Sequence, residues 1–299
     1  MSGAALVGGY AADLAIGDPV RWHPVAGFGR VAAALERVVY APSRARGAAF
    51  ALGLVGATGL LADALGRTRI GRGPVLLLLT WAVLGGRSLT REARRIATAL
   101  EAGELDVARA ALPALAGRDA DVLDRDGICR AVVESVAENT GDAVVGALIW
   151  GAVAGPAGVA AYRAANTLDA MVGQRSERYA EFGWAAARLD DALSWPGARL
   201  GAALAVALAP AVGGSPAAAW RVLRGDGAAH PSPNAGRLEA AFAGALGVRL
   251  GGPLSYGGRP ELRPELGDGP APGPEAVRRA TMLSLAVGIA ATGLCAARA

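Results

Sequence analysis

The sequence lacks lysine altogether, so that all 30 of its basic residues are arginine. This absence excludes a phosphate-binding loop of the G-x-x-x-x-G-K-[ST] kind, which needs the lysine ammonium group. Any anion that the protein binds must instead be held by guanidinium groups, backbone N–H groups or a metal ion. A GC-rich genome, which favours arginine codons, is sufficient to explain the bias itself.

Cysteine and histidine are also scarce, with two residues of each. Cys129 and Cys295 lie far apart and neither belongs to a CxxC motif, so the sequence supports neither a structural zinc site nor a disulfide. The two histidines, His23 and His230, are too few for a histidine-rich metal site.

Charged residues make up only 19% of the chain, whereas hydrophobic residues make up 53% and the mean hydropathy is +0.34. Soluble domains carry about 25% charged residues, so this composition indicates a membrane protein that contacts the lipid bilayer. The net charge of +4 is modest and no arginine run is interleaved with aromatic residues, so we expect no nucleic-acid partner. The first apolar stretch, from Ala4 to Ile16, lacks a basic start and contains Asp13, which argues against a cleaved signal peptide.

Several apolar segments have the length and spacing of membrane helices. Gly47 to Gly66 is the clearest, because twenty residues match a hydrocarbon core of roughly 30 Å and Asp63 is its one charge. Strand signals are almost missing, since β-branched runs of alternating polarity do not occur. The sequence predicts an all-α, polytopic membrane protein with about four to six membrane segments, and the other apolar stretches are 74–86, 144–162 (broken by Gly155-Pro156), 200–213 and 280–297.

The stretch 87–128 differs from its surroundings because it is polar, with apolar residues at three- and four-residue spacing. This pattern predicts a helical hairpin outside the membrane, with Glu104 and Asp106 near the break between its arms. We therefore expect one domain over residues 1–299 with a polar helical insertion at about 87–128. The arginines of the insertion favour a cytoplasmic location.

A ten-residue motif occurs twice, as AENTGDAVVG at 137–146 and AANTLDAMVG at 164–173, with seven identical positions. Asn and Asp prefer helix caps, so two caps in related surroundings would explain the pattern. Polar groups at membrane depth are costly unless paired, so the alternative is a functional cluster built from two similar halves.

Acidic and basic residues gather around these copies. Arg130, Glu134 and Glu138 repeat at four-residue spacing, which fits an exposed ion-pair ladder or a carboxylate cluster for Mg²⁺. Arg188 and Asp191 can pair on a solvated helix or contribute to an anion pocket. Further along, Ser232-Pro233 after His230 predicts a helix start, with Ser232 as N-cap and exposed N–H groups that suit a phosphate.

Four motifs together resemble the CobD/CbiB family of cobalamin biosynthesis. They are DLAIGDPVRWHPV, GRDADVLDRDGICRAVVESVAENTGDAVVGALIW, YRAANTLDAMVGQRSERYAEFGWAAARLDDALSWPGARL and HPSPNAGRLEAAFAGALGVRLGG. The resemblance extends to about Gly258, whereas the tail beyond Arg259 is poorly shared. The segments GDAVVGALIW and SWPGARL also differ from the sequence pattern that is common in the family at these positions.

The resemblance implies a multi-pass enzyme of the inner membrane, adenosylcobinamide-phosphate synthase, whose active site we expect to face the cytoplasm. Such an enzyme joins (R)-1-aminopropan-2-yl phosphate, or aminopropanol, to the free carboxylate of adenosylcobyric acid in an ATP-dependent amide ligation that implies Mg²⁺. Other late enzymes of the pathway are possible partners.

An amide ligase must bind phosphate, hold a metal and deprotonate an amine, and the motifs contain residue types for each task. For catalysis we expect Glu134, Glu138, Asp169 and His230. For substrate and phosphate binding we expect Asn139, Thr140, Arg163, Asn166, Thr167, Arg175, Arg178, Arg188 and Asn234. For metal binding we expect Asp142, Asp190 and Asp191.

Two other classes of protein fit the same pattern. A membrane transporter also has interrupted helices around a polar site, but it would not form an amide in the absence of a gradient. A non-catalytic scaffold for corrinoid enzymes would keep pathway flux when Asp142 or Asp169 is replaced by Ala.

Overall fold

The computed structural model describes residues 2–19, 23–174, 176–256 and 258–299. The chain folds into two compact units, each built from segments that are separate in the sequence. The first unit comprises Met1–Gly85, Asp142–Gly197 and Thr292–Ala299. The second unit comprises Gly86–Gly141 and Ala198–Ala291.

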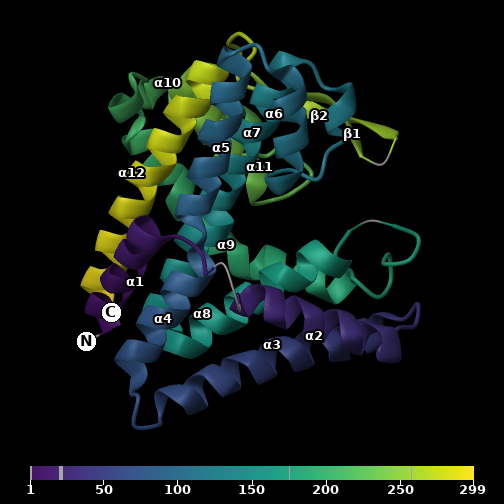
Figure 1. The fold of residues 1–299 in the computed structure, drawn as a ribbon, viewed down its shortest axis with the longest axis vertical. Coiled ribbons are helices and arrows are strands. Elements are labelled where there is room, and N and C mark those ends of the chain that lie inside the picture. Colours follow the sequence, from purple (N-terminus) through teal and green to yellow (C-terminus); the bar gives the residue numbers. More distant parts are fainter. Residues whose placement is uncertain (1, 20–22, 175, 257) are drawn as a thin grey trace. The chain divides into compact units, whose positions relative to one another are not determined.

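The first unit is entirely helical in its described part. In it α3 and α4 pack on α8, and α1 packs on α4 (Figure 1). The left-handed Gly17, with φ of 77°, follows the last residue of α1, as the Gly17-Asp18-Pro19 sequence predicts. The helices are α1 (Ser2–Ile16), α2 (Pro24–Val39), α3 (Arg44–Gly66), α4 (Arg72–Leu84), α8 (Gly146–Val172), the first part of α9 (Trp184–Ala207) and the end of α12 (Pro274–Arg298).

The core of the first unit lies between α2, α3, α8 and the start of α9. Its small side chains let the helices approach closely, as is common between membrane helices. Two aromatic rings also pack in this core, and the ring centroids of Phe50 and Phe182 are 5.2 Å apart. The buried residues of this cluster are Ala32, Phe50, Ala51, Val55, Ala164, Ala165, Leu168, Val172, Phe182 and Ala186.

A kink interrupts α8 at Gly155, whose φ of 61° and ψ of −142° are not helical. Pro156 follows it, and proline disfavours a helical residue before it. The break that the Gly155-Pro156 pair predicts is therefore present. The remainder of α8 carries the second copy of the repeated motif toward its C-terminal end.

The second unit contains helices, short 3₁₀ turns and one β-hairpin. In it α10 and α7 both pack against α11, and α6 packs against α5 (Figure 1). Helices α5 and α6 form a hairpin with the break at 102–104, which includes Glu104, and the location of the polar insertion outside the membrane stays a prediction. Its elements are α5 (Gly86–Glu101), α6 (Leu105–Ala111), α7 (Arg125–Asn139), α10 (Pro216–Asp226), α11 (Ala235–Leu246), β1 (Leu250–Tyr256), β2 (Arg259–Leu266), the turns Leu112–Ala114, Ala120–Val122 and Ala209–Val212, and the remaining parts of α9 and α12.

The hairpin was not expected from the sequence. Strands β1 and β2 pair antiparallel, with Leu254 opposite Glu261 and Pro253 opposite Leu262. Gly251 and Gly252 both have positive φ, and the register shifts between Leu250 and Gly252. Glycine and proline inside the strands hide the alternating polarity by which a strand is recognised, which explains the missed prediction.

The two copies of the repeated motif take different conformations. The first ends α7 at Asn139 and continues into a π-helical turn, Thr140–Val145, whereas the second lies within the last turns of α8. Both copies include a helix end, because Thr140 is the C-cap of α7 and Gly173 is the C-cap of α8. The interpretation of the copies as two helix caps in related surroundings therefore stays open.

Four helices within the described residues are long and apolar enough to cross a membrane. Together with the helical architecture they confirm the all-α, polytopic fold class. The shorter apolar helix Ser2–Ile16 adds a possible fifth segment, whereas the predicted apolar segment 200–213 is not among the four. The four are Arg44–Gly66, Arg72–Glu101, Arg125–Val172 and Pro274–Arg298.

Candidate functional site

The first unit contains a polar cluster around Arg163 on α8. Its Nη1 atom donates to Oδ1 of Asn166, one helical turn further on, at 3.2 Å. The Nε atom is buried and has no hydrogen-bond partner among the described residues. The carboxylates of Asp18, Asp142 and Asp190 interact with this guanidinium electrostatically. A residue of each motif copy, Asp142 and Asn166, is thus adjacent to the same arginine.

Asp190 on α9 extends this cluster. Its Oδ1 atom accepts hydrogen bonds from Nδ2 of Asn166 at 3.3 Å and from the Ser194 hydroxyl at 3.4 Å. Burial, followed by the nearby Asp169 carboxylate, raises the pKa of Asp190 to about 7. The cluster therefore holds more carboxylate charge than one guanidinium can balance.

A small cavity of about 70 Å³ lies against this cluster, and Arg163 and Thr167 are among the residues that line it. Apart from Arg163, Thr167 and Thr58 the lining residues are apolar, and nearly all of the surface that faces the cavity is hydrocarbon. Such a cavity suits a small ligand with one anionic group and one apolar group. The other lining residues are Pro24, Val25, Phe28, Thr58, Leu79, Val83, Ala160 and Ala164.

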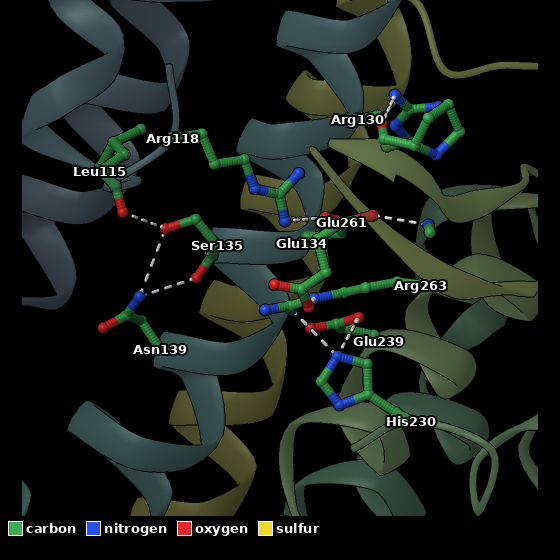
Figure 2. A network of polar contacts seen from close by, with 12 residues as sticks. Leu115, Arg118, Arg130, Glu134, Ser135, Asn139, His230, Glu239, Glu261 and Arg263 are labelled. Carbon is green, nitrogen blue, oxygen red and sulfur yellow. Dashed lines mark hydrogen bonds and ion pairs between the residues drawn. The ribbon is translucent and has the colours of Figure 1, made fainter. Parts of the chain in front are cut away.

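The second unit contains a separate polar cluster around Glu134 on α7 (Figure 2). Arg118 forms a buried ion pair with Glu134 Oε2, and Oε1 of the same carboxylate accepts from the Gly251 backbone N–H at 2.6 Å. The predicted ladder between Arg130 and Glu134 is not formed, because Arg130 donates to the Pro253 carbonyl at 3.0 Å instead. Glu134 is therefore part of the interior of the second unit rather than of an exposed helix face.

His230 and Glu239 lie beside this ion pair (Figure 2). The imidazole Nδ1 accepts from the Ser232 backbone N–H at 3.0 Å, so the proton of the neutral ring is on Nε2. Arg263 Nη1 is 3.1 Å from Nε2 but can only donate, which leaves Glu239 Oε2, at 3.9 Å, as the acceptor that this N–H faces. In this arrangement Glu239 accepts a proton more readily than His230, the base that the sequence indicated.

Burial determines the charge states of this pair. It is the largest cause that lowers the pKa of His230, and the Arg263 guanidinium lowers it further. Burial also raises the pKa of Glu239 well above its usual range, and the Glu134 and Glu138 carboxylates add to that rise. The imidazole is consequently neutral near pH 7.

The remaining predicted residues of the second unit differ in accessibility. Glu138 is exposed, and Asn139 is half-buried. Thr140 is fully buried, and its hydroxyl forms hydrogen bonds with the Val136 carbonyl at 2.6 Å and the Ser284 hydroxyl at 2.7 Å, which makes it a core residue.

Asn234, at the start of α11, accepts a hydrogen bond from Arg199 at 2.6 Å. Helix α11 begins after Asn234, so Ser232 is not its N-cap, although the Ser232 hydroxyl still accepts from the Ala235 N–H at 3.1 Å.

Comparison with known proteins gives one consistent result. The family model described as CobD/Cbib protein matches residues 6–284. A cobalamin biosynthesis protein CobD from Mycobacterium tuberculosis is 53% identical over 277 residues, which cover 92% of this chain and 88% of that protein. CobD proteins from Chromobacterium violaceum and Rhodobacter capsulatus are 44% and 42% identical, and cover 91% of this chain and 88% and 89% of their own. No solved structure matches the chain.

The chain belongs to the CobD/CbiB family. The match of the CobD/CbiB model continues to residue 284, which corrects the expectation that the likeness fades beyond Arg259. The hairpin and the first part of α12, up to residue 284, therefore belong to the shared part. A role in cobalamin biosynthesis and a membrane environment follow from this membership and from the four apolar helices.

The arginines that follow the second motif copy differ from the expected anion ligands. Arg178 donates to Glu36 Oε1 at 3.0 Å and stacks 4.2 Å from the ring centroid of Tyr40, and the hydrogen bond to Glu36 raises the pKa of Arg178. These contacts attach the segment before α9 to α2. Arg188 pairs with Asp191 at 4.0 Å on an exposed helix face, as its spacing predicts. Arg175 lies outside the described residues.

The expected metal site has no complete set of protein ligands. Among the described residues no three His, Cys, Asp or Glu side chains gather closely enough to bind a metal. Asp142, Asp190 and Asp191 would therefore need oxygen atoms from a substrate, as Mg²⁺ sites commonly use.

Sequence reasoning missed Arg118, Ser135 and Arg263 as members of the second cluster, and it placed Glu239 only near a phosphate at the helix start after His230. Arg118 and Arg263 come from different elements from their partners, and their separations in the chain have no helical period. Glu239 had the best local signal, since it lies one turn into the helix that follows the HPSPN sequence.

Proposed function

We propose that the protein is a membrane-bound ligase that forms an amide between the free carboxylate of adenosylcobyric acid and (R)-1-aminopropan-2-yl phosphate or aminopropanol. The product is adenosylcobinamide phosphate or adenosylcobinamide. Membership of the CobD/CbiB family supports the pathway. The observation that carries the reaction is the buried Arg163 beside an apolar cavity, with the Asp142 carboxylate of one motif copy and the Asn166 amide of the other next to it.

Arg163 is suited to hold the phosphate of the amine substrate. Its buried Nε–H donor is unused among the described residues, and Asn166 fixes the guanidinium plane through Nη1. A guanidinium group donates to two phosphate oxygens at once, which orients the bound group. The adjacent apolar walls, such as Val25 and Phe28, suit the methyl group of an aminopropanol.

Forming an amide from a carboxylate requires an activated acyl group and a deprotonated amine. We propose ATP as the co-substrate, which supplies the activating phosphoryl group, together with Mg²⁺, which balances its charge. Hard carboxylate oxygens of Asp142, Asp190 and Asp191 fit Mg²⁺ when phosphate oxygens complete the shell. The chain itself contributes a carboxylate that accepts the amine proton, and Asp169, which interacts with Asp190 in the same unit as Arg163, is the candidate.

The test is product formation by the purified protein in detergent, given adenosylcobyric acid, the amine, ATP and Mg²⁺. A ligase forms the amide and consumes ATP without any membrane gradient, whereas a transporter or a scaffold forms none. Absence of amide with correctly folded protein contradicts the proposal.

Arg163→Lys tests the role of the guanidinium group. Lysine keeps the charge but loses the two-pronged contact, so we expect KM for the phosphorylated amine to rise about tenfold or more, as for the loss of a charge-assisted hydrogen bond. KM for unphosphorylated aminopropanol should change little. Arg188→Lys, on the exposed helix face, is the matched control, and an equal effect of both variants would contradict the assignment.

A further inference from the structure

Hydrogen bonds among Leu115, Ser135 and Asn139 fix the orientation of the Asn139 amide. Leu115 precedes α7, and the other two residues lie on it. The Ser135 hydroxyl lies 2.8 Å from the Leu115 carbonyl oxygen. A carbonyl oxygen can only accept, so the hydroxyl proton of Ser135 must point to Leu115. The Ser135 oxygen therefore has only lone pairs left for any other neighbour.

Asn139 is that neighbour, one helical turn further on. Its side chain contacts the Ser135 carbonyl at 2.9 Å and the Ser135 hydroxyl oxygen at 3.3 Å. Both of these atoms must accept, so only the NH₂ group of Asn139 can face them. The flipped amide would place an oxygen atom against two acceptors, and the network excludes it.

The carbonyl oxygen of Asn139 consequently points away from Ser135, as Figure 2 shows. Within the part of the chain that the structure describes, no group donates to this Oδ1 atom. The residue is half-buried, whereas Ser135 and Thr140 on either side of it are buried. The helix end thus presents one oriented, neutral acceptor whose rotation is prevented by two hydrogen bonds.

We propose that Ser135 is a positioning residue, which holds Asn139 Oδ1 as the acceptor for a primary carboxamide N–H of the corrinoid substrate. This inference rests on the proposed function, since a cobyric acid carries primary carboxamides at its periphery. An oriented acceptor rejects the carboxylate, ester and phosphate groups, which have no N–H to donate.

A carboxamide fits this acceptor better than the ammonium group of the amine substrate does. An ammonium group is held most strongly by a charged carboxylate. Glu138, which is exposed and adjacent in sequence, would provide one. Asn139 provides a neutral oxygen with one fixed direction, which matches a neutral donor of similar strength.

The experiment measures binding of the corrinoid to the purified, detergent-solubilised protein without amine or ATP. Two corrinoids are compared: adenosylcobyric acid, and a derivative whose peripheral carboxamides are methyl esters and which therefore has carbonyl groups but no N–H donors. We expect the unmodified protein to prefer the carboxamide form. Asn139→Ala should weaken binding of the carboxamide form about tenfold and leave the ester form unchanged, as for loss of one hydrogen bond.

Ser135→Ala tests the positioning role. Without the hydroxyl group the Asn139 amide loses one of its two anchors, so discrimination between the two corrinoids should fall while the melting temperature stays near that of the unmodified protein. Ser135→Thr, which keeps a hydroxyl group, should restore discrimination. Thr90→Ala, which removes a hydroxyl that also donates to helix carbonyls in the second unit, is the control and should leave discrimination intact.

Unchanged discrimination in Asn139→Ala overturns the inference, as does a change in the affinity for the amine in place of the corrinoid. Equal binding of both corrinoids by the unmodified protein overturns it as well. Because no amide is formed in this assay, a protein that discriminates but makes no product contradicts the proposed function alone.

Discussion

At the residue scale, the ion pair between Arg118 and Glu134 has the greatest influence on stability. Their side chains are only 7% and 3% exposed, so neither charge can be solvated by water when its partner is removed. Arg118→Met should destabilise the second unit by about 3–5 kcal/mol, the usual cost of an uncompensated buried charge.

Thermal unfolding in detergent measures this cost. The double variant Arg118→Met with Glu134→Gln should regain part of the loss, because it removes the remaining charge. Arg221→Met, which breaks an exposed pair with Asp268, is the matched control and should cost less than about 1 kcal/mol. Equal losses for the two single variants would contradict the assignment.

His230 makes the stability depend on pH. Burial and Arg263 lower the folded-state pKa of His230, so the unfolded chain binds a proton more readily than the folded protein. The stabilising contribution is therefore complete above the unfolded pKa of about 6.5 and is lost as the pH falls through the folded pKa. The raised pKa of Glu239 has the opposite sign, because the folded protein keeps that carboxyl proton to a higher pH than the unfolded chain does. Its stabilising contribution is complete below the unfolded pKa and is lost as the pH rises through the folded pKa, so it opposes the His230 contribution over part of the same range.

Between pH 7.5 and pH 5 the His230 contribution lowers the melting temperature as the pH falls, and we expect His230→Gln to remove this part of the pH dependence. Glu239→Gln in the same measurements separates the carboxylate contribution from that of the imidazole. A slope that survives in His230→Gln would assign the acid sensitivity to other groups.

The role of an individual residue was predictable only where its contacts are made within a local sequence motif. Asp142, Asn166 and Asp169 could be expected near an arginine because each lies in a repeated motif beside an apolar helix. Arg178 could not be distinguished from Arg163 by sequence, since the acidic and aromatic groups that engage it come from α2. The tautomer of His230 likewise depends on a backbone N–H two residues away.

At the scale of elements, the kink in α8 depends on glycine. Gly155 has a positive φ with ψ of −142°, a conformation that side chains with a Cβ rarely adopt. Gly155→Ala should therefore destabilise the first unit by about 1–3 kcal/mol, although no heavy atom of the described chain lies near the new methyl group.

Gly53→Ala in α3 is the matched control. That position is helical and also has open space around it, so alanine should leave stability unchanged or raise it slightly. The comparison uses thermal unfolding of both variants in the same detergent. A loss in Gly53→Ala as large as in Gly155→Ala would show that the backbone conformation is not the cause.

Helices were predictable from the sequence because apolar periodicity and length act locally. The segment expected from Gly47 to Gly66 begins three residues earlier in α3, where Ser43 forms the cap. The β1–β2 hairpin was not predictable, since its pairing depends on glycines in left-handed conformations. The π-helical turn after Asn139, Thr140–Val145, has no sequence signal that we could identify.

At the scale of the whole molecule, the composition decides the environment. The low share of charged residues and the positive mean hydropathy predicted membrane helices, and four helices of the described chain have the required length and hydropathy. The expectation of a single domain remains a prediction. What composition could not give is the number of crossings, because Arg125–Val172 is interrupted by a π-helical turn and a kink.

The parity of the crossings can be argued from the two ends of the chain. Both ends belong to the first unit, and a Cβ atom added to Gly3 would meet the Ala296 carbonyl, so α1 and the end of α12 are in contact (Figure 1). Ends that touch lie at the same membrane surface, which requires an even number of crossings. Reporter fusions at residue 1 and residue 299 should therefore report the same side, with a reporter in the polar turn at 102–104 as an internal reference. Opposite sides for the two ends would mean an odd number of crossings and would contradict the contact between Gly3 and Ala296.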